Sequence, residues 1–159
     1  MSAPHPLRFT RLSRISVEEL LSHMSDPRVA EHMPLMPESW ALESIQDFVA
    51  AKEACWHRDS LGHWAFLWDG VYIGWGGFQL EAGEWDYGLV LRPEHFGKGM
   101  AITRQALAFA KSDERIDFVT FLLPPTRLRL GALKRLGARQ VGSVTYDGQE
   151  FRKFRLETV

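Results

Sequence analysis

Several features are scarce in this chain, and each scarcity excludes a class of protein. Its single cysteine, Cys55, allows no disulfide within the chain. The formal net charge of −1 provides no basic field for nucleic acid or for an anionic membrane surface. No apolar run approaches the roughly 18–20 residues of a membrane-spanning helix, and residues 1–6 contain no apolar signal region. We therefore expect a cytoplasmic protein without nucleic-acid or membrane partners.

The spacing patterns of common metal and nucleotide sites are also missing. His57 and His63 flank the end of an expected helix, but neither has a cysteine or a second histidine at a metal-ligand spacing. We therefore predict no metal site. The loop Gly97–Met100 lacks the Walker spacing, and Ile102 stands where a dinucleotide fingerprint needs its third glycine. A nucleotide-binding protein of another fold is therefore disfavoured.

The composition is that of one globular domain. The chain has 159 residues, of which 45% are apolar and 25% charged, which is enough to build a core. No linker, repeat or low-complexity stretch divides it. We therefore treat residues 1–159 as a single domain.

The N-terminal part is expected to form one strand followed by helices. A strand at 7–12 precedes a helix capped by Ser16, with Glu19 completing a capping box. Asp26 caps a second helix, and we place the N-cap of a third helix at Ser39.

An antiparallel meander should follow these helices. Strands at 63–68 and 71–80 are joined by Asp69 and Gly70, which both tolerate positive φ in a tight turn. Glycines interrupt the second strand and predict a bulge or a close approach of another backbone: Gly74, Gly76 and Gly77.

The chain is organised around residues 85–110, which read as strand, glycine loop and helix. Arg92-Pro93 ends the strand Asp86–Leu91, because proline offers no N–H to a sheet. The free N–H groups where the helix starts favour an anion, and Gly97 and Gly99 let the backbone approach it. A phosphate or pyrophosphate is the expected ligand. The apolar face of the helix is expected at Ile102, Ala106, Phe109 and Ala110.

The last third of the chain is expected to return to the sheet. A strand at 116–123 should lie parallel to the strand at 86–91 through a right-handed crossover. A helix then ends at Gly137, and strands at 141–146 and 151–156 form a final hairpin.

Two segments resemble parts of the GNAT acyltransferases. Glu94–Gly99 resembles the [QR]-x-x-G-x-[GA] loop that holds the pyrophosphate of acetyl-CoA in that family, with Glu94 in place of Gln or Arg. Residues 25–34 resemble the entry helices of the ribosomal-protein N-terminal acetyltransferase (Rim-type) branch, where these helices form part of the acceptor site.

A third segment, Thr126–Gly137, resembles the second GNAT motif, N-x-x-S-x-x-x-L-x-K-L-G-F. Leu133, Leu136 and Gly137 match that motif. Substitutions stand at three of its other positions: Thr126, Arg129 and Ala138.

The resemblance implies a mixed α+β fold in which a mostly antiparallel central sheet contains two splayed parallel strands and carries flanking helices. It implies acetyl-CoA as co-substrate and no metal. An extended amide chain such as pantetheine can satisfy the open backbone groups of splayed strands. The expected cofactor-binding residues are Leu89, Val90, Leu91, Phe96, Gly97, Lys98, Gly99, Met100, Ala101 and Thr126.

Acetyl transfer to an amine requires a proton acceptor. Asp86 is the first candidate because it stands where family members often carry Glu, and Glu84, on the same strand face, is the second. A solvated or salt-bridged strand carboxylate is the alternative reading. Tyr87 lies on the opposite face and is expected in the core or the groove lining. Leu133 stands where many GNATs carry a tyrosine general acid, and it cannot donate a proton.

Two function classes follow from these residues. The first is an acetyl-CoA-dependent N-acetyltransferase acting on a primary amine, either a protein N-terminus or a small molecule. The second is a non-catalytic GNAT-fold protein that binds acyl-CoA as a sensor or scaffold. The sequence leaves open whether the chain forms a homodimer.

Overall fold

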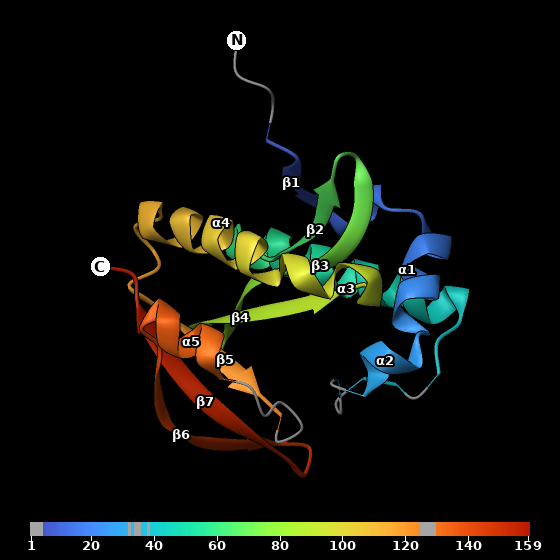
Figure 1. Ribbon diagram of the computed structural model, residues 1–159. Coiled ribbons are helices and arrows are strands. Elements are labelled where there is room, and N and C mark those ends of the chain that lie inside the picture. Colours follow the sequence, from blue (N-terminus) through green and yellow to red (C-terminus); the bar gives the residue numbers. More distant parts are fainter. Residues whose placement is uncertain (1–4, 32, 34–35, 38, 125–129) are drawn as a thin grey trace.

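The fold is one continuous sheet flanked by helices (Figure 1). The computed structural model describes residues 5–31, 33, 36–37, 39–124 and 130–159. In this part of the chain seven strands form a single sheet in the order β1-β2-β3-β4-β5-β7-β6. Only the β4–β5 pair is parallel, which confirms the predicted α+β fold with a mostly antiparallel sheet.

The strands are β1 (Leu7–Arg11), β2 (His63–Trp68), β3 (Val71–Glu81), β4 (Glu84–Leu91), β5 (Phe118–Leu123), β6 (Arg139–Tyr146) and β7 (Gln149–Glu157). The helices are α1 (Val17–Met24), α2 (Pro27–Ala30), α3 (Leu42–Asp59), α4 (Gly99–Ser112) and α5 (Gly131–Leu136), with 3-10 turns η1 (Leu12–Arg14) and η2 (Pro93–Lys98). None of the helices in the described ranges is long and apolar enough to cross a membrane.

Two of the three predicted helix caps are confirmed, and the third is wrong. The Ser16 hydroxyl accepts a hydrogen bond from the N–H of Glu19 at 3.2 Å, and Asp26 accepts one from the N–H of Arg28 at 2.9 Å. The predicted cap at Ser39 is wrong, because α3 begins at Leu42 after Ala41. Ser44 closes that first turn, since its hydroxyl accepts from the Ala41 N–H at 2.7 Å and donates to the Ala41 carbonyl at 2.9 Å.

The glycines of β3 mark a close approach between two strands, as predicted. A Cβ built on Gly76 would lie 2.2 Å from the carbonyl oxygen of Gly88 in β4, so a larger residue would push the strands apart. The preceding turn is also as predicted, with positive φ of 49° at Asp69 and 81° at Gly70.

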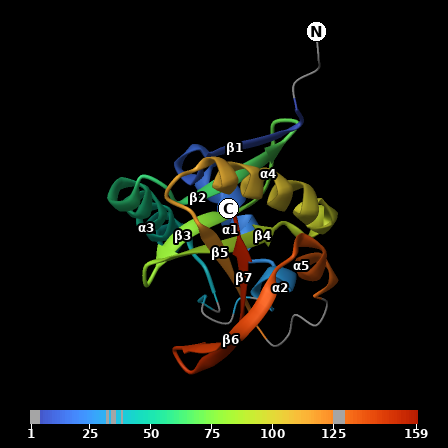
Figure 2. The same ribbon diagram turned by 90° about the vertical axis from the view of Figure 1, so that its left-hand side faces the viewer.

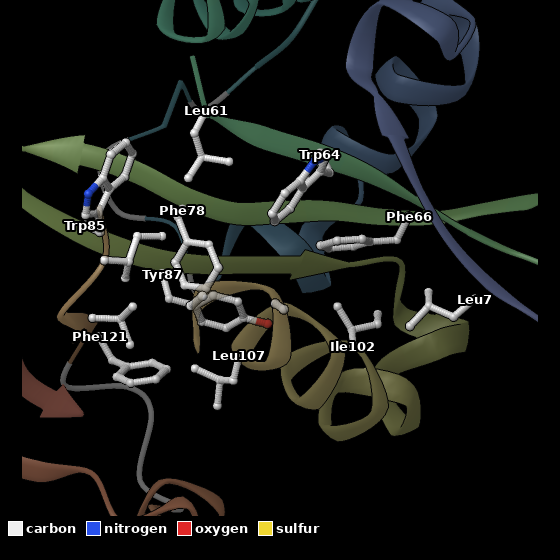
Figure 3. Packing of buried hydrophobic residues seen from close by; sticks show 14 of the residues in the cluster. Leu7, Leu61, Trp64, Phe66, Phe78, Trp85, Tyr87, Ile102, Leu107 and Phe121 are labelled. Carbon is white, nitrogen blue, oxygen red and sulfur yellow. The ribbon is translucent and has the colours of Figure 1, made fainter. Parts of the chain in front are cut away.

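The two faces of the sheet carry separate cores. On one face α4 packs its Ile102 and Ala106 against aromatic residues of the sheet, among them Phe66 and Phe78, which are fully buried (Figure 3). On the other face α1 and α3 cover a second cluster around Trp75. Figure 2 shows α3 and α4 on opposite sides of the sheet. The helices therefore leave β4 between two packed layers.

The parallel strands β4 and β5 pair only at one end. Their register joins Trp85 to Val119, Asp86 to Thr120 and Tyr87 to Phe121. Beyond Tyr87 the strands diverge (Figure 1). The N–H of Arg92 donates to the Ile73 carbonyl of β3 at 2.8 Å, so the end of β4 is held to β3.

Candidate active site

The divergence of β4 and β5 opens a cleft of about 580 Å³. Residues 86–90 of β4 and 121–123 of β5 form its two sides, the first turn of α4 closes one end, and α5 contributes Leu133 and Leu136. A smaller hollow of about 330 Å³ shares Leu89, Val90 and Phe96 with the cleft and is bordered by Arg28 of α2.

Backbone alternation decides which parts of β4 face the cleft. Because Arg92 is hydrogen-bonded to Ile73, the alternation of an antiparallel pair directs the backbone groups of Val90 and Gly88 toward β3. The N–H and C=O groups of Leu89 and Leu91 therefore face the open side. The sequence analysis grouped Leu89, Val90 and Leu91 together as cofactor-binding residues. In the structure, Val90 can contact a ligand in the cleft only through its side chain, because its backbone groups point to β3.

Asp86 lies in the part of β4 that pairs with β5, one residue before the last paired residue, Tyr87. The cleft begins at this point. The hydroxyl of Thr120, directly opposite on β5, donates to its Oδ1 at 2.9 Å. Burial raises the pKa of Asp86 to about 7, and the Thr120 hydrogen bond opposes that rise. A carboxyl with this pKa can exchange a proton near neutral pH.

Glu84 is in a different position from Asp86 although both share one strand face. Its carboxylate forms an ion pair with Lys153 of β7, with Oε1 and Nζ 2.5 Å apart. Glu84 is not among the residues that line either hollow. The structure therefore separates the two carboxylates that the sequence ranked first and second, and only Asp86 meets the cleft.

Tyr87 belongs to the α4 side of the sheet. Its hydroxyl shares a hydrogen bond of 2.8 Å with Thr103, and its ring packs against Phe78 and Phe121. Burial raises the pKa of Tyr87 above its usual value. It lines the cleft from the core side, which agrees with the core or groove-lining place that the sequence indicated.

The glycine loop folds as the 3-10 turn η2 and leads directly into α4, where the sequence predicted an irregular loop. Proline at the start of a helical turn has a suitable fixed φ, and the His95 N–H donates to the Arg92 carbonyl at 2.8 Å. Phe96, half exposed at 51%, lies with Gly97 at the entrance of the cleft.

The remaining predicted cofactor residues divide into three groups. Gly99 and Met100 line the cleft together with Phe96 and Gly97. Lys98 does not, because its ammonium lies 3.2 Å from His95 Nδ1 and over the ring of Trp68, and Ala101 is exposed outside the lining. Thr126 lies outside the described residues.

Glu94, the departure from the family loop pattern, forms a contact that the sequence did not reveal. Its Oε1 lies 3.3 Å from Nη2 of Arg28, whose guanidinium also binds Asp26. The loop is thereby connected to α2, which brings Arg28 to the smaller hollow.

Sequence reasoning missed residues that reach the site through long-range pairing. Thr120 is one, because its contact with Asp86 depends on the parallel register. Tyr146 and Phe151 are others, since the β6–β7 hairpin carries them to the cleft, with their ring centroids 6.3 Å apart. The turn residues predict the hairpin itself but give no information about what it faces.

Within the ranges that the structure describes, no group of three or more His, Cys, Asp or Glu residues is arranged to hold a metal ion. The polar residues that line the cleft are Asp86, Arg135 and the hydroxyl-bearing Tyr87, Thr103 and Tyr146, beside the open backbone groups of β4. This set of groups suits proton transfer and the binding of an extended amide chain.

The comparison with family models identifies the class of protein. A model of the acetyltransferase (GNAT) domain matches residues 7–139, which is most of the chain. The chain therefore belongs to the GNAT acetyltransferase family and is an N-acetyltransferase by class. No curated protein matches the sequence, and membership of the Rim-type branch stays a prediction.

Solved structures with the same fold include several acetyltransferases. A GNAT-family acetyltransferase from Bacillus anthracis has a TM-score of 0.75 and 16% identity, covering 97% of this chain and 96% of its own. A spermidine N-acetyltransferase from Vibrio cholerae, in complex with CoA and spermine, has 0.76 and 10%, covering 96% of each chain. An aminoglycoside acetyltransferase in complex with coenzyme A has 0.72 and 17%, covering 95% and 93%. At these identities the likeness concerns the fold.

Proposed function

We propose that this chain is an acetyl-CoA-dependent N-acetyltransferase whose acceptor is a primary amine, on a protein N-terminus or a small molecule. The observation that carries the proposal is the half-buried carboxyl of Asp86, hydrogen-bonded to Thr120 and with its pKa raised to about 7, at the inner end of an open cleft between parallel strands. Such a carboxyl favours the enzyme over a protein that only binds acyl-CoA.

The cleft fits the co-substrate. The open backbone groups of Leu89 and Leu91 can pair with the amides of pantetheine, as an added strand would. The N–H groups at the start of α4 suit a pyrophosphate, and Gly97 has open space where a Cβ would be. Bound acetyl-CoA supplies the acetyl thioester to this site. Fold relatives solved with coenzyme A support this assignment.

The role of Asp86 is to accept a proton from the acceptor amine, directly or through one water, as the amine attacks the thioester carbonyl. An α-amine has a pKa near ~7.7–8.0 and is partly neutral at pH 7, whereas a lysine amine near ~10.4 is almost wholly charged. With Leu133 where a tyrosine acid would stand, the site suits an amine that is easily deprotonated.

A thiol-release assay with acetyl-CoA and a panel of amines tests the proposal. We expect turnover with a peptide that has a free N-terminus, and slower turnover with the same peptide blocked at its N-terminus but carrying a lysine. Preference for the lysine peptide would overturn the assignment of an α-amine. Binding of acetyl-CoA without release of thiol for any amine would favour the sensor or scaffold.

A further inference from the structure

A half-buried lysine lies on the same face of the sheet as the candidate base, opposite α4. Lys52 of α3 extends its side chain over β3, where Nζ donates to Oε1 of Gln79 at 3.0 Å. The same nitrogen lies 5.0 Å from the ring centroid of Trp75 and 5.5 Å from that of Phe48. We call these four residues the Lys52 cluster.

The ammonium of Lys52 has few protein partners among the described residues. It carries three N–H donors, and the structure gives it one hydrogen bond, to a neutral amide. Among the described residues no carboxylate forms an ion pair with it; Glu81 acts on it only at longer range, through space. Burial lowers the pKa of Lys52 to about 8, so the amine is still mostly charged at pH 7. An anion placed here would find unused donors.

Gln79, a member of the Lys52 cluster, is the cross-strand neighbour of Asp86. Gln79 of β3 stands directly opposite Asp86 of β4 in the antiparallel register. Side chains in such a pair share a face with Cβ atoms about 4.5–5.5 Å apart. An acceptor that reaches along this face from Asp86 would therefore meet Gln79 first and then Lys52.

A second polar group on this face has an unpaired nitrogen. His63 of β2 is buried, and the centroid of its ring lies 5.4 Å from that of Trp75. A Cβ built on Gly88 would lie 3.6 Å from His63 Nε2. Its Nδ1 has no hydrogen-bond partner among the described residues. Burial, together with the charge of Lys52, holds the pKa of His63 well below its usual value, so this ring stays neutral.

The rest of this face is apolar. Trp40 and Phe48 meet edge to face at 5.6 Å, and Phe48 meets Trp75 at 5.0 Å. Met33 and Met36 pack against the apolar core cluster that contains Trp75, and they also line the cleft. A ligand here would contact hydrocarbon and aromatic surface between its two polar ends.

We propose that Lys52 is a specificity-determining residue that binds a carboxylate on the acceptor, so that the acceptor amines are those that carry an apolar segment and a carboxylate. This proposal rests on the proposed function and narrows its substrate class. Polycationic amines are disfavoured at this site, because a second ammonium group would meet the charge of Lys52.

Matched amine pairs test the proposal kinetically. The substrates are 4-aminobutanoate, 5-aminopentanoate and 6-aminohexanoate, each compared with its neutral primary amide. For at least one length we expect kcat/KM to favour the carboxylate by about 10-fold or more, mostly through KM, because a charge-assisted hydrogen bond contributes about 1.5–3 kcal/mol. In Lys52→Met that ratio should fall to about one. Lys52→Arg should retain most of it.

Lys111→Met is the matched control, because Lys111 is an exposed lysine on α4. It should keep the wild-type ratio. Equal use of acid and amide by the wild type, or the same preference in Lys52→Met, would overturn the assignment.

A binding measurement separates this proposal from the proposed function. In protein with ¹³C-labelled lysine, the Cε signal of Lys52, assigned through Lys52→Met, should shift on titration with 6-acetamidohexanoate but not with 6-acetamidohexanamide. The absence of a shift with the acid overturns the carboxylate site whatever the activity. A shift without any acetyl transfer would leave the anion site standing and would overturn the enzymatic role.

Discussion

The two halves of β4 use the same backbone for different purposes. From Trp85 to Tyr87 the strand pairs with β3 and β5, so only the side chains of these residues are free to contact other groups. From Gly88 to Leu91 it pairs with β3 alone, and half of its backbone groups are left for another molecule. The paired half holds a candidate base in a fixed place, whereas the open half provides a binding edge.

The difference shows why strand separation is useful in this fold. A fully paired sheet would satisfy Leu89 and Leu91 internally and leave no edge for a ligand. A sheet that opened earlier would take Thr120 away from Asp86 and leave the carboxyl without its hydrogen bond. The divergence after Tyr87 keeps the Asp86 carboxyl three residues from Leu89, the first residue with open backbone groups.

The strongest test of this division changes the paired half alone. Asp86→Asn should lower kcat by about 10²–10⁴-fold, the usual contribution of a general base. The affinity for acetyl-CoA should hardly change, because the open half is untouched. Steady-state kinetics with calorimetric titration of CoA measure both. Unchanged turnover would move the role to Glu84 or to bulk water.

Removing a core side chain that packs beneath the paired half of β4 should lower the stability of the fold without weakening CoA binding. Phe78 is fully buried, so Phe78→Ala should lower the free energy of unfolding by about 3–5 kcal/mol. Phe96 is 51% exposed, so Phe96→Ala should change it by no more than about 0.5 kcal/mol while weakening CoA binding. Urea unfolding of the two variants compares them. Similar losses for both would contradict the distinction.

A side chain added where α4 begins should block the open half. Gly99→Val places methyl groups toward the cleft beside Leu89, and Gly99 has an ordinary helical φ of −58° that valine accepts. A ligand at 100 times its Kd stabilises the folded state by about 2.7 kcal/mol. The corresponding rise in Tm with acetyl-CoA should disappear. Ala54→Val, at an exposed position of α3, should keep it.

The smallest expected effect is a shift in pH dependence. The reaction needs deprotonated Asp86, so the rate should rise with pH through about 7. The Thr120 hydroxyl lowers that pKa, so Thr120→Val should move the rising limb to higher pH, by about one unit or less, with activity recovering at high pH. Thr103→Val, which removes the hydroxyl bonded to Tyr87, should leave the limb in place. A limb that shifts equally in both variants would argue against Asp86 as the titrating group.

Local chemistry accounts for what the sequence could predict. Asp69-Gly70, the cap at Ser16 and the strand–loop–helix around Gly97 and Gly99 each depend on neighbours a few residues away. The cap at Ser39 failed because a hydroxyl five residues later, on Ser44, closes the turn instead.

The rest of the site depends on pairing that no local pattern contains. The Thr120 contact with Asp86 requires the β4–β5 register, and the Lys52 cluster requires a helix from one part of the chain to meet a strand from another. The different backbone directions of Leu89 and Val90 follow from a single hydrogen bond, from Arg92 to Ile73. The sequence named residues of the site but could not tell which of their backbone groups face β3 and which face the cleft.

Amide hydrogen exchange with and without CoA tests the central claim most directly, since it follows each N–H of β4. The Leu89 and Leu91 amides face the open side, so CoA should slow their exchange by about 10-fold or more if it docks as a strand would. The Gly88 and Val90 amides, already directed to β3, should change little and serve as the internal control. Binding of CoA with no protection at Leu89 and Leu91 would contradict the account.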